Sequence, residues 1–129
     1  MTIVARAEVL PSAKNEGVTK TVTTGDSIQW VLIFSPVPTV LLSYLVLNVG
    51  ENAVDVTILR SKIPVAKGLE AIDPDDDMWT VILDEDELAA AGQLEAVIDD
   101  QHDRVLAIGV ASAVSESDSE VIISLGASA

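Results

Sequence analysis

Apolar runs of strand length recur along the chain and alternate with short polar or turn-forming stretches. The runs cover residues 2–10, 18–23, 28–34, 40–48, 53–60, 78–83, 93–98, 104–113 and 120–125. In one run Val54, Val56 and Ile58 alternate with Asp55 and Thr57, which is typical of a strand with one buried face. This spacing predicts an all-β fold, an immunoglobulin-like antiparallel β-sandwich of about eight to nine strands.

One segment, from Asp84 to Gly92, has a helical pattern instead. It begins with acidic residues, continues with alanines and ends at a glycine. Acidic side chains complement the dipole at a helix N-terminus, and glycine commonly ends a helix. We therefore predict one short helical turn here, as a connection between two strands.

Residues 27–50 contain no charged side chain, and a segment of this length is also compatible with a transmembrane helix. Pro36 and Pro38 lie in its middle, where a helix interior tolerates proline least. Its flanking residues are Asp26 and Glu51 rather than lysine or arginine. Two buried strands joined by a proline-containing turn are therefore favoured over a membrane helix, and no membrane association is expected.

Both of these predicted strands are apolar on both faces, whereas an antiparallel strand usually keeps one polar face for solvent. The second face must then be covered as well. A neighbouring subunit is one candidate for this cover. The longer segments of the chain itself are the other candidate, and the sequence leaves the choice open.

The length of 129 residues is sufficient for a single domain with its own core. No internal repeat or low-complexity linker divides the chain, so residues 1–129 are expected to form one sandwich domain, with residues 1–17 as a possible N-terminal arm. Apolar residues make up 49% of the chain and its mean hydropathy is +0.41. Such a composition favours apolar surface that is hidden against partners.

The chain is strongly acidic, with 21 Asp and Glu against 7 Lys and Arg and a net charge of −14. A field of this sign repels phosphate backbones and anionic lipid, which argues against nucleic-acid binding. The sequence holds no cysteine, which excludes disulfides and thiolate sites. The first residues lack the basic and long apolar stretches of a signal peptide, so a cytoplasmic origin is expected.

Catalytic chemistry finds little support in the sequence. His102 is the single histidine, and Asp103 follows it in an acidic turn. A histidine–carboxylate pair can orient a general base, but no nucleophile motif of the type Gly-x-Ser-x-Gly accompanies this one. We expect a solvated loop histidine and no enzymatic activity.

A second acidic turn offers carboxylates at alternate positions, Asp73, Asp75 and Asp77. Hard cations such as Ca²⁺ take oxygen ligands, so these residues are a candidate metal site. An EF-hand loop needs glycine at its sixth position, where Met78 stands here. A loosely held Ca²⁺ ion and a solvated turn that protects a strand edge both remain open; no other cofactor is expected.

The order of features from residue 24 onward resembles the N-terminal domain of phage baseplate upper proteins and related head or tail fibres. Gly25-Asp26-Ser27 precedes an apolar strand, and an acidic turn at residues 73–77 precedes a strand that contains an aromatic residue. A short acidic turn ending in Gly92, then a strand, a polar turn and another strand complete the pattern. The resemblance implies an immunoglobulin-like sandwich and a non-enzymatic virion part that anchors or decorates.

The sequence therefore predicts a non-enzymatic viral structural protein of tailed-phage type, a capsid decoration or a tail or fibre attachment component. It would bind other virion proteins and itself, as a homo-oligomer with a trimer favoured, in virions assembled from chains made in the host cytoplasm. The alternative is a Ca²⁺-dependent adhesion or carbohydrate-binding β-sandwich. The expected interface residues come from the uncharged segment: Trp30, Leu32, Phe34, Val37, Leu41, Tyr44 and Leu45.

Overall fold

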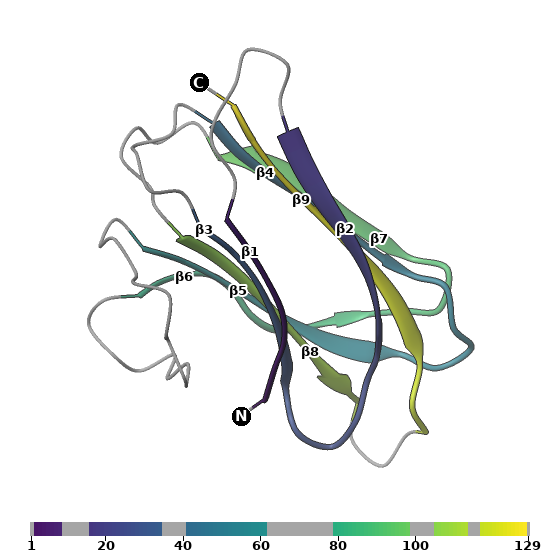
Figure 1. Ribbon diagram of the computed structural model, residues 1–129. Helices are drawn as coiled ribbons and strands as arrows, with labels where there is room; N and C mark the ends of the chain where they lie inside the picture. Colours follow the sequence, from purple (N-terminus) through teal and green to yellow (C-terminus); the bar gives the residue numbers. More distant parts are fainter. Residues whose placement is uncertain are drawn as a thin grey trace.

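The computed structural model describes residues 2–8, 16–34, 41–61, 79–98, 105–113 and 117–128, which form nine strands (Figure 1). The strands are β1 (Thr2–Glu8), β2 (Glu16–Thr23), β3 (Gln29–Phe34), β4 (Leu41–Asn48), β5 (Val54–Ser61), β6 (Thr80–Leu88), β7 (Gln93–Ile98), β8 (Val105–Ser112) and β9 (Glu120–Ser128). Each of them overlaps an apolar run of the sequence, and β6 extends beyond its run through the acidic residues 84–87. The prediction of an all-β sandwich with about eight to nine strands is therefore confirmed.

The strands form two sheets that pack face to face, as Figure 1 shows. One sheet has five strands in the order β1-β3-β8-β5-β6, and the other has four in the order β2-β9-β4-β7. All neighbours are antiparallel except β1 and β3, which are parallel. Strands β2 to β9 alone make two four-stranded rows with jelly-roll connectivity, and β1 adds a fifth strand to one of them.

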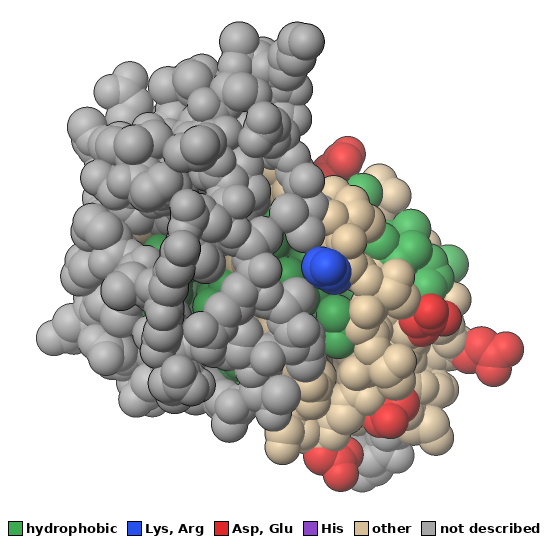
Figure 2. Space-filling model, in the orientation of Figure 1, with side chains coloured by type: hydrophobic (Ala, Val, Ile, Leu, Met, Phe, Trp, Pro, Cys, Tyr) green, Lys and Arg blue, Asp and Glu red, His purple; other side chains and the backbone are tan. Residues whose placement is uncertain are grey.

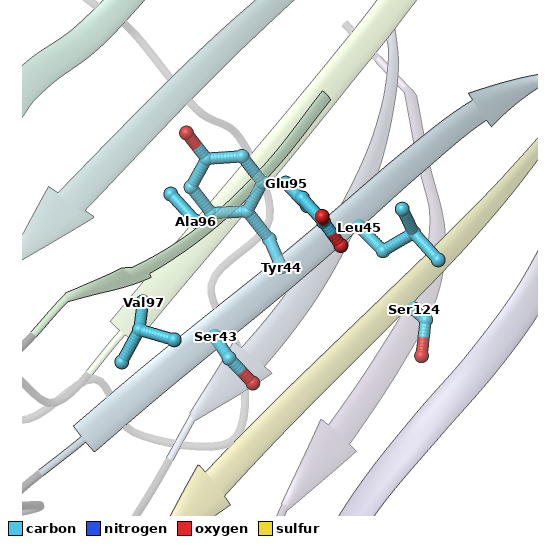
Figure 3. A pocket seen from close by; sticks show the side chains of 7 residues that line it. All are labelled: Ser43, Tyr44, Leu45, Glu95, Ala96, Val97 and Ser124. Carbon is cyan, nitrogen blue, oxygen red and sulfur yellow. The ribbon is translucent and has the colours of Figure 1, made fainter. Parts of the chain in front are cut away.

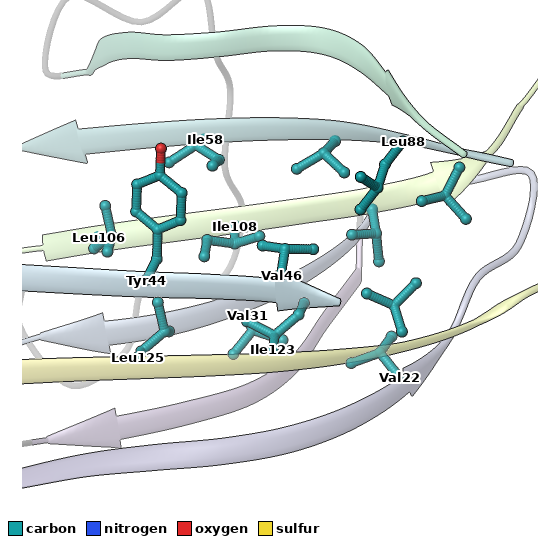
Figure 4. Close-up of a cluster of buried hydrophobic side chains, with 14 residues drawn as sticks. Val22, Val31, Tyr44, Val46, Ile58, Leu88, Leu106, Ile108, Ile123 and Leu125 are labelled. Atoms are coloured by element: carbon teal, nitrogen blue, oxygen red, sulfur yellow. The ribbon is translucent and has the colours of Figure 1, made fainter. Parts of the chain in front are cut away.

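The main core lies between the two sheets and is built from alternate residues of the facing strands (Figure 4). Tyr44 and Val46 of β4 and Ile123 of β9 meet Ile58 of β5 and Ile108 of β8. Side chains along a strand point to opposite faces in turn, so these positions fix which residues face outward. Branched aliphatic side chains supply most of this cluster, as expected for a chain with only 3% aromatic residues.

A second apolar cluster covers the outer face of the five-stranded sheet. It consists of Trp30, Leu32, Leu59, Trp79, Val105 and Ala107. Trp30 is 0% exposed and Leu32 is 2% exposed in the single chain. The sequence left open whether a neighbouring subunit or the chain itself covers the second apolar face of this strand. For β3, residues of the same chain cover it.

Gly109 allows this packing because its missing side chain leaves room for the Trp30 ring. A Cβ atom at position 109 would lie 2.8 Å from Cζ3 of Trp30 and 2.6 Å from Cγ2 of Ile28. Gly109 and Trp30 are partners in the β3–β8 register, so the indole lies across the backbone of the neighbouring strand. No L-amino acid with a side chain fits position 109 unless both the indole and the Ile28 side chain move.

The prediction of a helical turn from Asp84 to Gly92 is wrong. Residues up to Leu88 belong to β6, where Leu88 pairs with Val54 and is buried in the main core. The acidic residues of this strand lie along an edge of the five-stranded sheet, where their charges discourage pairing with another chain. A tight turn follows, in which Ala91 has a φ of 63°. Pairing with β5 therefore outweighs the local helix propensity.

Residues 29–34 and 41–48 of the uncharged segment form strands β3 and β4 rather than a helix. Within the described ranges, no helix has the length and apolarity required to cross a membrane.

Candidate interaction surface

The outer face of the four-stranded sheet carries aligned rows of short polar and aliphatic side chains. In one row the register places Thr19 of β2 beside Ser124 of β9, Ser124 beside Leu45 of β4, and Leu45 beside Glu95 of β7. The hydroxyl of Thr19 donates to that of Ser124 at 3.1 Å. The sheet backbone thus fixes the positions of these four side chains.

Two neighbouring rows extend this surface on either side. One row runs from Thr21 through Ile122 and Leu47 to Gln93, and the other pairs Ser43 with Val97. We call the ten residues of the three rows the Leu45 face: Thr19, Thr21, Ser43, Leu45, Leu47, Gln93, Glu95, Val97, Ile122 and Ser124. All of them are exposed or half-buried, because the alternate positions of the same strands point into the core.

A shallow, open hollow of about 510 Å³ lies on this face (Figure 3). It is lined by Ser43, Tyr44 and Leu45 of β4, Glu95, Ala96 and Val97 of β7, and Ser124 of β9. Val97 is 62% exposed, the largest exposure among the large hydrophobic residues of the described chain. The hollow offers an aliphatic floor with hydroxyl groups and one carboxylate.

The Leu45 face differs from the rest of the molecule in its low charge. Glu95 is its one charged residue, in a chain whose net charge is −14. Figure 2 shows apolar side chains gathered on the right of the visible surface, where β4, β7 and β9 lie in Figure 1, with acidic side chains at the border. Charge depletion over partly apolar area is a typical property of the central part of a protein–protein interface.

A polar network at one end of the sandwich is the other notable cluster, and its centre is the buried Asn48. The amide Nδ2 of Asn48 donates to the backbone carbonyls of Asn52 at 2.8 Å and Leu88 at 3.2 Å. Its Oδ1 accepts hydrogen bonds from the Gly50 N–H at 3.1 Å and the Ser119 hydroxyl at 2.9 Å. The amide of Asn48 is thus fully used within the chain.

Thr24 extends this network to the connection before β3. The Ser119 N–H donates to Oγ1 of Thr24 at 2.9 Å, and the Thr24 N–H donates to the Ser119 carbonyl at 2.9 Å. The hydroxyls of Thr24 and Ser112 share a further hydrogen bond of 3.1 Å, and Ser112 donates to Oδ1 of Asp118 at 3.1 Å. These groups satisfy one another, so the network ties strand connections together rather than presenting groups to a ligand.

The residues that the sequence assigned to an interface fall into three groups. Trp30, Leu32 and Tyr44 are buried, the first two in the outer cluster and Tyr44 in the main core. Burial raises the pKa of Tyr44 above its ordinary value of 10.0. Leu45 lies on the Leu45 face. Partner contacts through any of these residues stay a prediction.

The remaining predicted site residues lack a described side chain. Phe34 and Leu41 belong to β3 and β4 through their backbones. The others lie outside the described residues: Val37, Asp73, Asp75, Asp77 and His102. Among the residues that are described, no group of three or more His, Asp or Glu side chains could hold a metal ion. The Ca²⁺ and His102 hypotheses therefore stay untested.

Sequence reasoning missed most of the Leu45 face because it searched for apolar residues. In β2 the signal was present, because Thr19 and Thr21 alternate with Val18 and Val22. In β4 it was absent, because Leu45 and Leu47 are as apolar as the core residues of the same strand. Which strands lie side by side depends on the sheet order, and the sequence pattern alone does not give that order.

Comparisons with known proteins give information on the fold only. No family model matches the chain, and no curated protein matches its sequence. The chain is similar to part of tripeptidyl peptidase 2, with a TM-score of 0.57 and 11% identity over 93% of this chain and 10% of that one. It is also similar to PirA, with a TM-score of 0.50 and 10% identity over 84% of this chain and 92% of that one.

A pilus protein of Bacillus endospore appendages is a further structural neighbour, with a TM-score of 0.46 and 10% identity over 88% of this chain and 86% of that one. The TM-scores of 0.57 and 0.50 for tripeptidyl peptidase 2 and PirA show a shared fold alone, because their identities are only 11% and 10%. They carry no information on activity or partners, because one fold hosts many unrelated functions.

Proposed function

We propose that the chain is a non-enzymatic structural protein that works through protein–protein contacts made by the Leu45 face. The observation that carries this proposal is the combination of low charge, half-exposed aliphatic side chains and rigid strand positions on that face. Side chains fixed on regular strands lose little conformational freedom when a partner covers them. Leu45 and Val97 are the expected contact centre.

The specific role that we propose is that of a virion component, a capsid decoration or a tail or fibre attachment protein. The baseplate-like order of features in the sequence supports it. The jelly-roll arrangement of β2 to β9 also supports it, because this architecture is common in viral capsid proteins. The chain would then associate with itself, as a trimer, and with other virion proteins, without nucleic acid or membrane.

Carbohydrate binding, which the jelly roll also serves in lectins, has weaker support. Sugars commonly stack on exposed aromatic rings. The three aromatic side chains that are described, Trp30, Tyr44 and Trp79, are all buried in the two core clusters. The carboxylates that motivated a Ca²⁺-dependent module, Asp73, Asp75 and Asp77, lie outside the described residues. We therefore favour the protein-contact role.

Light scattering on matched variants tests the proposed contact surface. We expect the full chain to form a closed oligomer and Val97→Asp to lower its mass toward the monomer without changing the thermal midpoint. Val81→Asp is the control, because Val81 is 45% exposed but belongs to β6 of the other sheet. Equal effects of the two variants, or a full chain that is monomeric and binds no virion protein, would refute the proposal.

The virion role has a separate test. An antibody against the chain should label purified virus particles from the source of the sequence, and mild dissociation should release the chain intact. Particles that lack the chain would overturn the virion assignment but leave the contact surface in place.

A further inference from the structure

Strand β1 is an addition to a fold that is complete without it. The jelly roll consists of β2 to β9, in two antiparallel rows of four strands. β1 lies at the edge of the five-stranded sheet and hydrogen-bonds to β3 alone among the described strands. No other strand depends on its position in the sheet.

The β1–β3 pair differs from the other described strand pairs in its direction, and its register is interrupted once. It is the one parallel pair among the described strands, and parallel ladders are slightly less stable per residue than antiparallel ones. The register shifts between Ile3 and Ala5, which interrupts the ladder near its start. Exchange of β1 therefore costs less than exchange of an internal strand.

Leaving the β3 edge unpaired when β1 is absent would cost free energy. β3 is buried on both faces, with Val31 in the main core and Trp30 and Leu32 in the outer cluster. Without β1 the strand presents a row of unpaired N–H and C=O groups beside apolar side chains, which is a template for another chain. A β1 segment from a second copy reproduces the same register with no new contact.

We propose that β1 is an exchangeable strand, and that in the assembled protein the β3 edge of one copy takes β1 of a neighbouring copy. The partner is a second copy of this chain. Every hydrogen bond of the β1–β3 ladder is preserved in the exchange. The high effective concentration of neighbouring copies in an assembly is therefore sufficient to favour pairing between copies over pairing within one copy. The proposal does not rest on the Leu45 face, which belongs to the other sheet.

Engineered cysteines in the otherwise cysteine-free full chain test the exchange. Thr2 and Gln29 are partners in the register, and so are Ala7 and Ile33. Thr2→Cys chains are mixed with Gln29→Cys chains, and Ala7→Cys chains with Ile33→Cys chains. Each mixture is partly unfolded in urea, refolded together and oxidised. We expect disulfide-linked dimers that contain one chain of each kind, in at least a severalfold excess over a mixture of Thr2→Cys with Thr21→Cys.

The double variants Thr2→Cys/Gln29→Cys and Ala7→Cys/Ile33→Cys test the alternative, in which β1 pairs with β3 of its own chain. Disulfides confined to single chains in these variants, with no mixed dimer above the Thr21→Cys control, would show that β1 stays with its own copy. A full chain that light scattering finds monomeric up to millimolar concentration would overturn the exchange in the same way. Mixed dimers at both register pairs would support it, whatever the Val97→Asp variant does.

Discussion

The hydroxyl of Ser119 donates to Oδ1 of Asn48 at 2.9 Å, although the two residues are 71 positions apart in the sequence. This bond joins the end of β4 to the segment that leads into β9. Both residues are buried, so each polar atom that loses its partner stays away from water. Breaking a hydrogen bond of this polar network should therefore lower the free energy of unfolding, because the remaining partner stays buried and unsatisfied.

Replacing Asn48 with Asp should lower the free energy of unfolding by about 3 kcal/mol. The carboxylate cannot donate to the carbonyls of Asn52 and Leu88, and it places a charge at a fully buried position. Urea unfolding followed by tryptophan fluorescence measures the change. Asn52→Asp is the control, because the Asn52 amide makes its bond to Asp118 at the exposed rim and its loss should cost under about 1 kcal/mol. Equal losses in the two variants would contradict this account.

Replacing Gly50 with Ala should lower the free energy of unfolding by about 3 kcal/mol, because the new methyl group clashes with the network. Its Cβ would overlap the Ser119 hydroxyl and lie 2.7 Å from the backbone nitrogen of Glu120. Gly25→Ala is the matched control, since its nearest atom would be Nε2 of Gln29 at 3.7 Å. Thermal unfolding of both variants checks the prediction, which fails if Gly50→Ala melts with the parent protein.

Replacing Ala91 with Gly should raise the free energy of unfolding by about 1 kcal/mol, because Ala91 has a φ of 63°, where an L side chain is strained. The neighbouring Ala90 is exposed in the same turn and, within the described part of the chain, Ala91 is the one non-glycine residue with a positive φ. Ala90→Gly should therefore destabilise slightly through the flexibility of the unfolded chain. Opposite signs for the two variants in urea unfolding are the expected result, and a common sign would argue against strain.

The stability should fall at high pH through Tyr44. Burial raises the pKa of Tyr44 in the folded state above its ordinary value of 10.0. The unfolded chain therefore loses the phenolic proton first, and the stabilisation, fully present below pH 10, is lost as the pH rises through the folded-state pKa. Absorbance at high pH reports Tyr44 alone, because the chain has one tyrosine. Tyr44→Phe removes this component, so an unchanged pH dependence in that variant would disprove it.

The sequence was sufficient for the secondary structure because period-two alternation and turn residues are local signals. An apolar run marked each of the nine strands, although the two uncharged strands lack the alternation and the run that marks β6 ends at residue 83. The segment from Asp84 to Gly92 was mistaken for a helical turn, since its acidic residues followed by alanines form a locally helical pattern. Its pairing with residues 54–56 of β5 is a contact across the sequence that no local pattern reveals.

The candidate surface was less accessible to sequence reasoning, again because it depends on sheet order. Leu45 was identified from its apolar character, but its neighbours Ser124 and Glu95 come from strands that are distant in the sequence. Trp30 looked like an interface residue for the same reason that it is a core residue, since both environments select large apolar side chains. Only the folded chain shows that the indole is already covered.

The packing of Trp30 against Gly109 has a consequence for how this sequence can evolve. Because a Cβ at position 109 would collide with the indole, neither position can change freely while the other is kept. A substitution at 109 becomes acceptable only after residue 30 has become smaller and the Ile28 side chain has shifted, and a smaller residue 30 alone leaves a void in the outer cluster. Homologous sequences should therefore show the two positions changing as a pair, so this pairing can serve as a fold signature where overall identity is too low to align.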